Sequence, residues 1–77
     1  MEMKPENTTV IEAPMPGKII SYEVSEGASV REGEVVLVLE ALKMENAIMS
    51  PITGVVKKIN FKKGDNVEDG DVLAILG

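Results

Sequence analysis

One lysine of this 77-residue chain, Lys43, stands between two apolar side chains, Leu42 and Met44, with Glu40 and Glu45 close outside them. Buried lysines are rare without a partner, and exposed turns seldom place apolar residues on both sides of a charge. A lysine amine can form an amide with an activated carboxyl group once it has lost the proton that it carries near neutral pH. Only a protruding lysine can enter another enzyme's active site for that reaction. Acylation of Lys43 is thus one chemistry that this stretch could undergo, if the lysine protrudes.

Other kinds of chemistry lack the residues that they need. The chain contains no histidine and no cysteine, which excludes a catalytic triad, a nucleophile and base dyad, and an ordinary zinc site. The segment DNVEDG, residues 65–70, hints at a calcium loop, but Val67 occupies the third ligand position. We therefore expect no metal site and no independent catalysis.

Charge and hydropathy limit the partners. Thirteen acidic and eight basic residues give a net charge of −5, which repels nucleic-acid phosphates and anionic lipid surfaces. The longest apolar run, residues 35–39, is far shorter than the roughly 20 residues of a membrane-spanning helix. We expect no nucleic-acid partner, no membrane insertion and a cytoplasmic location. Residues 1–8 are polar and include Pro5, which indicates a disordered lead-in or linker stub before one small domain, residues 9–77.

The chain repeats itself on either side of Lys43. Residues 13–40 align without a gap with residues 50–77. The alignment pairs six of the seven glycines: Gly17 with Gly54, Gly27 with Gly64, and Gly33 with Gly70. Each pair is expected to serve one backbone need, either a turn with positive φ or a close approach of two chains. The sequence thus predicts two copies of one structural unit, with residues 41–49 as a linking segment that belongs to neither.

Each copy has the pattern of short β-strands. Polar and apolar residues alternate around Tyr22 and Val24, and again around Ile59 and Phe61, while VVLVL and VLAIL are apolar on both faces. Turns are predicted at the glycine-containing segments SEGA, KKGD, REGE and EDGD. One copy alone would expose an apolar face, so the two should pack together about a pseudo-twofold axis. The predicted fold class is all-β, a sandwich or flattened barrel of about eight short strands.

The linking segment must turn back tightly to reach the next strand, MENAIMS. The shortest route is a two-residue hairpin turn at Leu42 and Lys43, which places Lys43 at a tip. Such turns favour Asn-Gly or Asp-Gly because both positions take positive φ, so Leu-Lys would accept backbone strain there. A lysine is usually just a solvated charge, but the place of Lys43 between the two copies favours modification. Since alternate residues of a hairpin face opposite sides, we expect one of Leu42 and Met44 to pack inward and the other to be exposed.

With its paired glycines, with APMPG at 13–17 and with ALKMEN at 41–46, the chain resembles the biotinyl domain of biotin-dependent carboxylases and decarboxylases. The resemblance covers the chain from about Val10 to Gly77. It implies a flattened barrel of two four-stranded antiparallel sheets, with biotin attached covalently to Lys43. The biotin arm would carry a carboxyl group between active sites. The implied partners are a biotin protein ligase, a biotin carboxylase component, and a carboxyltransferase or decarboxylase component.

The same resemblance assigns ligase recognition to the flanking residues Ala41, Leu42 and Met44. Glu40 and Glu45, beside them, are further candidates for ligase recognition. Leu42 departs from the family, which usually has methionine there; the two side chains are similar in volume, so modification is expected to be slower or unchanged. Glu40 and Glu45 could orient basic groups of the ligase, or they could be solvated charges.

Neither copy contains an insertion, so the extra excursion typical of bacterial acetyl-CoA carboxylase carriers is absent. The resemblance therefore points to carriers of pyruvate, propionyl-CoA or methylcrotonyl-CoA carboxylases, of transcarboxylase, or of oxaloacetate and methylmalonyl-CoA decarboxylases.

Two related kinds of domain are the alternatives. Lipoyl domains resemble biotinyl domains in fold, but their lysine typically lies between aspartate and alanine, whereas Lys43 lies between Leu42 and Met44. Unmodified modules of similar fold occur in membrane-fusion adaptor proteins, beside long helical hairpins, and this sequence has no helical pattern. Biotin is therefore the favoured cofactor.

Overall fold

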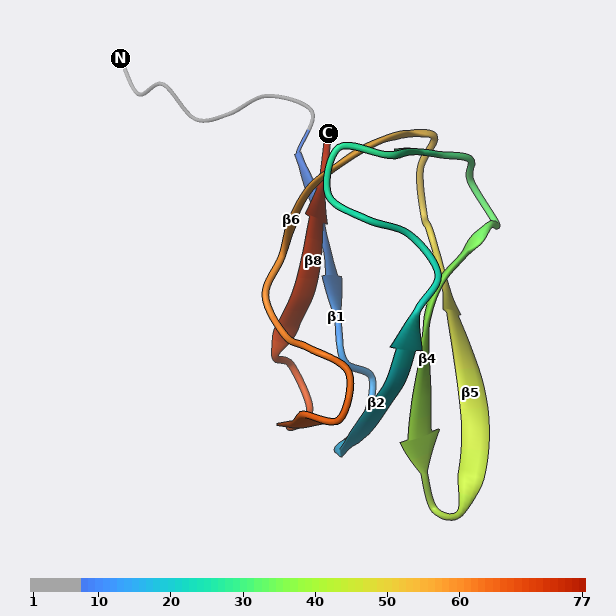
Figure 1. Cartoon of the computed structure of the whole chain (residues 1–77), viewed down its shortest axis with the longest axis vertical. Helices are drawn as coiled ribbons and strands as arrows, with labels where there is room; N and C mark the ends of the chain where they lie inside the picture. Colours follow the sequence, from blue (N-terminus) through green and yellow to red (C-terminus); the bar gives the residue numbers. More distant parts are fainter. Residues whose placement is uncertain (1–7) are drawn as a thin grey trace.

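The computed structural model describes residues 8–77, which form two four-stranded antiparallel sheets facing each other (Figure 1). The strands are β1 (Thr9–Glu12), β2 (Gly17–Tyr22), β3 (Ser29–Val30), β4 (Val35–Ala41), β5 (Met44–Met49), β6 (Gly54–Ile59), β7 (Asn66–Val67) and β8 (Val72–Leu76). The predicted all-β class is confirmed. Within the described part of the chain, no helix is long and apolar enough to cross a membrane. The predicted lead-in, residues 1–8, lies outside the described residues except for Thr8.

The two sheets are built alike, in the orders β1-β8-β6-β3 and β5-β4-β2-β7. Each sheet combines strands of both copies, because the short β3 of the first copy pairs with β6 of the second, and β7 pairs with β2 in the same way. The exchange ties the halves together by main-chain hydrogen bonds. The predicted pseudo-twofold arrangement is confirmed.

The symmetry reaches further along the chain than the sequence indicates. The pair Thr9 and Leu76, between β1 and β8, corresponds to the pair Asn46 and Leu39, between β5 and β4. Both pairings shift register at the equivalent place, where one residue of the buried strand is skipped. The prediction that residues 41–49 belong to neither copy is therefore wrong for residues 46–49. The signal was too weak to find, because TVIE and NAIM share only one residue.

The core lies between the sheets and follows the same symmetry. Equivalent positions of the two copies are buried together, as in the pairs Ile19 with Val56, Val30 with Val67, and Leu39 with Leu76. Aliphatic side chains fill almost all of this space, as expected for a chain with only one tyrosine and one phenylalanine. The symmetric core makes a rigid base for whatever projects from its ends.

Two of the three glycine pairs form the tight turns that the sequence predicts. Gly27, Gly33, Gly64 and Gly70 have φ between 87° and 92°. Each is the third residue of a turn closed by a main-chain hydrogen bond from the fourth residue to the first. In such turns a positive φ at the third position favours glycine. All four predicted turns are confirmed.

Two strand boundaries differ from the prediction. Val24 and Phe61 lie just beyond the ends of β2 and β6, at Tyr22 and Ile59. Both side chains still pack against the core. Alternation in the sequence reports which face a side chain takes, and here that alternation continues after the ladder hydrogen bonds have ended.

Candidate functional site

The β4–β5 hairpin ends in a two-residue turn made of Leu42 and Lys43. The last strand pair joins Ala41 to Met44. Leu42 has φ 55° and Lys43 has φ 63°, the positive values that a two-residue turn of this kind requires at both positions. A residue other than glycine in this region costs roughly 1–3 kcal/mol. The predicted strained turn is confirmed, with Lys43 at the tip (Figure 1).

Both apolar neighbours of Lys43 are exposed, Leu42 by 88% and Met44 by 63%. The expectation that one of them packs inward is wrong. Leu42 lies beyond the last strand pair, so it has no sheet face to occupy. Met44 pairs with Ala41 on the inward face of the hairpin, but it stays exposed because the hairpin extends there past the end of the opposite sheet (Figure 1). Large apolar side chains this exposed gain little from burial in the domain. They form an apolar bracket in solvent on either side of the lysine.

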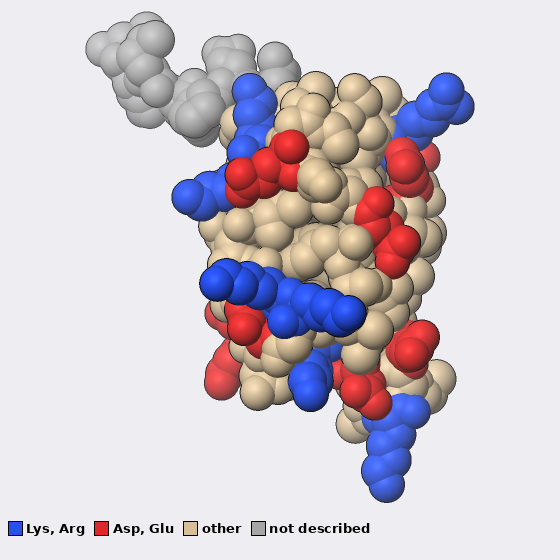
Figure 2. All heavy atoms as spheres, in the orientation of Figure 1, with Lys and Arg blue, Asp and Glu red and all other residues tan. Residues whose placement is uncertain are grey.

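The amine of Lys43 meets no partner among residues 8–77. Lys43 is exposed, and within residues 8–77 its side chain has neither a hydrogen bond nor an ion pair. Figure 2 shows a basic side chain projecting into solvent from this end of the molecule, and Lys43 is the one lysine of the hairpin. An unpaired amine at a tip is accessible to the active site of another protein.

The other predicted recognition residues lie at the base of the turn. Ala41 is 6% exposed, whereas Glu40 and Glu45 are exposed and lie directly opposite each other in the hairpin. Two like charges directly opposite in a ladder are destabilising. The hairpin therefore presents two carboxylates beside the turn at some cost to its own stability.

Asn46 and Gly17 hold the hairpin in place, and the sequence did not indicate this role for either residue. The side-chain nitrogen of Asn46 donates hydrogen bonds to the carbonyl oxygens of Leu39, at 3.4 Å, and Met44, at 3.2 Å. Gly17 of β2 lies so close to β4 that a Cβ atom there would be 2.5 Å from the carbonyl oxygen of Glu40. Asparagine inside a strand is disfavoured, which was the available signal for Asn46.

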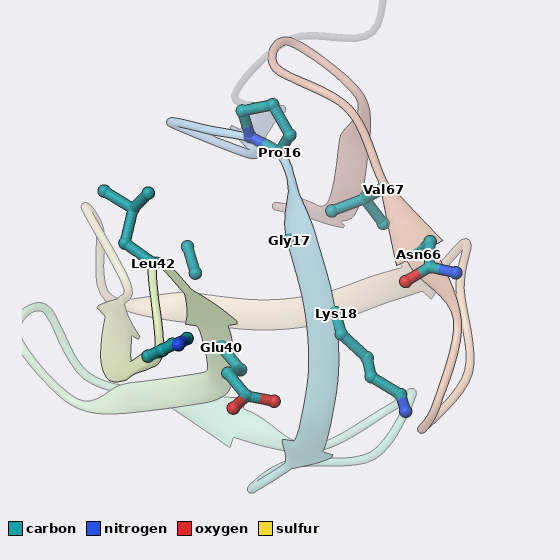
Figure 3. Close-up of a pocket in the computed structure, with 9 residues that line it drawn as sticks. Pro16, Gly17, Lys18, Glu40, Leu42, Asn66 and Val67 are labelled. Carbon is teal, nitrogen blue, oxygen red and sulfur yellow. The ribbon is translucent and has the colours of Figure 1, made fainter.

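An open groove of about 450 Å³ lies beside the turn (Figure 3). It runs between the start of β2, the hairpin and β7. Its lining comprises Pro16, Gly17, Lys18, Glu40, Ala41, Leu42, Lys43, Asn66 and Val67. Lys43 thus rises from the edge of a shallow surface with both polar and apolar walls.

Residues 9–76 match the model of a family described as biotin-requiring enzymes. The chain belongs to this family. Its fold is also that of a domain in the solved urea carboxylase of Kluyveromyces lactis, with a TM-score of 0.88 and 30% identity, over 99% of this chain and 7% of that one. The predicted family is confirmed.

Two curated relatives of this biotin-requiring family member are much longer chains. The mitochondrial propionyl-CoA carboxylase alpha chain of Homo sapiens is 38% identical over 71 residues, which are 92% of this chain and 10% of that one. The gamma subunit of methylmalonyl-CoA decarboxylase from Veillonella parvula is 42% identical over 67 residues, which are 87% of this chain and 52% of that subunit. The chain is thus a non-catalytic biotin carboxyl carrier domain of the carboxylase and decarboxylase kind, as its sequence predicted.

Proposed function

We propose that Lys43 is the residue to which biotin is attached. The observation that supports this most strongly is an exposed amine that has no partner in the described part of the chain, at the tip of a turn whose two residues both take a strained conformation. A turn of Asn and Gly would form the same hairpin at lower cost. The strain at Leu42 and Lys43 is accounted for if another protein must read these two side chains.

The residues around Lys43 fit such a group. The amine is unpaired, the adjoining groove is open, and no side chain of residues 8–77 covers the tip. When bound, biotin supplies a ring nitrogen that can carry a carboxyl group. The hairpin contributes a rigid base that holds the arm at high effective concentration near successive active sites.

We propose that a biotin protein ligase recognises the apolar bracket of Leu42 and Met44 directly. Ala41 is buried, so we assign it to the shape of the turn's base and not to contact with the ligase. The opposed carboxylates of Glu40 and Glu45 are placed to meet basic groups of the ligase. The ligase would accept the proton that the Lys43 amine must lose before its lone pair attacks the activated carboxyl carbon. The bond to the activating group, which ATP supplies, would then break, and that group would leave with the bonding electrons as the amide forms.

The parent enzyme is, we propose, a biotin-dependent carboxylase or decarboxylase. Support comes from the relatives named above, of which this chain spans from a tenth to about half. The partners would then be a biotin carboxylase component and a carboxyltransferase or decarboxylase component. The cytoplasmic location expected from the sequence stays a prediction.

Incubation with biotin, ATP and a biotin protein ligase tests the attachment site. The wild-type chain is expected to gain the mass of biotin less one water, and Lys43→Arg to gain nothing, because a guanidinium does not form the amide. Lys18→Arg, in the wall of the same groove, is the matched control and should be modified at the wild-type rate. Intact-mass spectrometry reads all three.

Lipoate with a lipoate ligase is the second arm of the same experiment, and no mass gain is expected there. A lipoylated product without a biotinylated one would reject biotin as the cofactor. An unmodified wild-type chain, beside a known acceptor that reacts in the same tube, would reject Lys43 as the attachment site.

A further inference from the structure

Four lysines gather on and after β6 of a chain whose net charge is −5. They are Lys57, Lys58, Lys62 and Lys63, and all four are exposed. No ion pair links any of them to an acidic residue in the described part of the chain. We call this set the lysine strip. Figure 2 shows basic side chains crossing the face of the molecule on the side where β6 and the turn after it lie.

The strip depends on two local features of the backbone. The register between β6 and β8 shifts between Val56 and Lys58, which lets the consecutive residues Lys57 and Lys58 both reach solvent. Lys62 and Lys63 begin the turn that Gly64 and Asp65 complete, and the Asp65 carboxylate accepts a hydrogen bond from the Lys62 backbone N–H at 2.9 Å. Both pairs are thus held at the surface by ordered backbone.

The internal repeat shows that the fold does not need these charges. The equivalent positions of the first copy are Ile20, Ser21, Ser25 and Glu26. They have the same backbone, with a register shift between Ile19 and Ser21 and a glycine turn at Gly27 with φ 89°. The first copy therefore folds without a single lysine where the second has four. Such a difference between otherwise equivalent surfaces calls for a reason outside folding.

The strip extends toward the acceptor end of the molecule. The turn of residues 62–65 lies against β2, because Gly64 donates a hydrogen bond to the carbonyl of Ile19 at 2.7 Å and Ile19 donates to that of Asp65 at 2.9 Å. The neighbouring residue, Lys18, lines the groove beside Lys43 (Figure 3). In contrast, the equivalent turn of the first copy lies against β6, through Gly27 and Val56.

We propose that the lysine strip docks the carrier on an acidic protein surface beside the active site of its biotin carboxylase component; this rests on the proposed carrier function. An acidic patch of matching size attracts the strip without facing the acids on the rest of the chain. DNA or an anionic membrane extends further, so it would also face the acidic residues on the rest of the chain and be repelled by them. Charges at the edge of an interface mainly raise the association rate and orient the encounter. Fast, weak docking suits a carrier that must leave again for a second site.

Association kinetics with the separately purified biotin carboxylase component test the docking surface. All carriers are compared in the Lys43→Arg background, so that the result does not depend on biotin attachment. Replacing the four lysines by glutamine is expected to lower the association rate constant at low salt by about tenfold. The difference should vanish in about 1 M salt, where the screening length is about 3 Å. Circular dichroism and thermal melting establish that each variant is folded.

Lys63→Glu and Arg31→Glu are a matched pair, because each makes the net charge two units more negative. Arg31 lies at the end of the molecule opposite the hairpin tip. The N–H of Gly33, in the same turn, donates a hydrogen bond to the carbonyl oxygen of Ser50, which follows the end of β5. Lys63→Glu should slow association several-fold more than Arg31→Glu. Equal effects of the pair, or a wild-type rate in the four-glutamine variant, would overturn the proposal.

Co-sedimentation with vesicles of phosphatidylglycerol and phosphatidylcholine, and a gel shift with duplex DNA, are run on the same variants. Neither is expected to bind the wild-type chain. Lysine-dependent binding to either, together with unchanged association with the component, would assign the strip to a different class of partner and reject our proposal. Biotinylation of Lys43 in the variants with the native lysine is measured separately, and its failure would reject only the attachment site.

Discussion

At the scale of single residues, the hairpin tip favours presentation of the lysine over stability. Leu42 and Lys43 both take positive φ, the side chain of Leu42 contributes almost nothing to the core, and Glu40 and Glu45 oppose each other at the base of the turn. Each feature is unfavourable for folding. Each is accounted for if a ligase reads this end of the molecule.

Leu42→Asn should relieve strain and weaken recognition together. Asparagine tolerates the left-handed region and is preferred at the first position of such turns. We expect the free energy of unfolding to rise by about 1 kcal/mol, which corresponds to an increase in Tm of about 4–8 °C for a domain of this size. The rate of biotinylation should fall at the same time. Unchanged biotinylation in a stabilised variant would contradict direct reading of Leu42.

At the scale of elements, the position of the hairpin depends on how closely β2 approaches β4. Gly17 and Gly54 occupy equivalent places in the two copies, and neither has positive φ. A Cβ atom at Gly17 would be 2.5 Å from the Glu40 carbonyl oxygen, and one at Gly54 would be 2.9 Å from that of Gly77. The same close approach therefore supports the lysine hairpin in one copy and the carboxyl end of the last strand in the other.

Gly17→Ala and Gly54→Ala form a matched pair that separates stability from presentation. Both should lower the free energy of unfolding by about 1–3 kcal/mol, because backbone must move to admit the methyl group. Only Gly17→Ala displaces the strand that leads into the hairpin. It should therefore slow biotinylation more than Gly54→Ala, measured at a temperature where both variants are fully folded. Equal rates would show that the hairpin tolerates a shift of its base.

At the scale of the whole molecule, strand exchange joins the two copies, and a side-chain hydrogen bond joins the two sheets. The hydroxyl of Tyr22, on β2, donates a hydrogen bond to the carbonyl oxygen of Leu73, on β8 in the opposite sheet, at 3.2 Å. Burial raises the pKa of this phenol above its ordinary value of 10.0. The backbone of Phe61 acts in the opposite direction on this pKa, and the charge of Asp65 raises it further.

Tyr22 should make stability fall at alkaline pH. Its pKa is higher in the folded than in the unfolded chain, so above pH 10 the unfolded state binds fewer protons and is favoured. Its stabilising effect is fully present below that pH and is lost as the pH rises toward the folded pKa. Since it is the only tyrosine, the phenolate absorbance follows it alone.

The titration midpoint should lie above 10 in the native chain and return to about 10 in denaturant. Lysines also titrate in this range, so the comparison needs Tyr22→Phe, which should remove part of the alkaline loss of stability. An identical loss in Tyr22→Phe would show that Tyr22 does not contribute to it.

The amino-acid sequence alone determined the features that depend on local backbone requirements. Glycine in the third position of four turns, the repeat of residues 13–40 in 50–77 and the short distance between two apolar strands were enough to place Lys43 at a hairpin tip. A positive φ restricts the residue type wherever it occurs, and strand alternation has a fixed period. Such signals can be read without knowledge of which strands pair.

Only the tertiary structure decided what depends on contacts between distant segments. The equivalence of β1 and β5 and the position of Gly17 against Glu40 follow from the pairing of strands far apart in the sequence. Leu42 and Met44 are both exposed because the hairpin extends past the opposite sheet (Figure 1). The four lysines of the strip can be read from the sequence. Only the structure shows that the equivalent residues of the first copy have the same backbone without any lysine. The residues of one strand determine which side chains share a face, but not which other strands lie beside it, so these features depend on strand pairing.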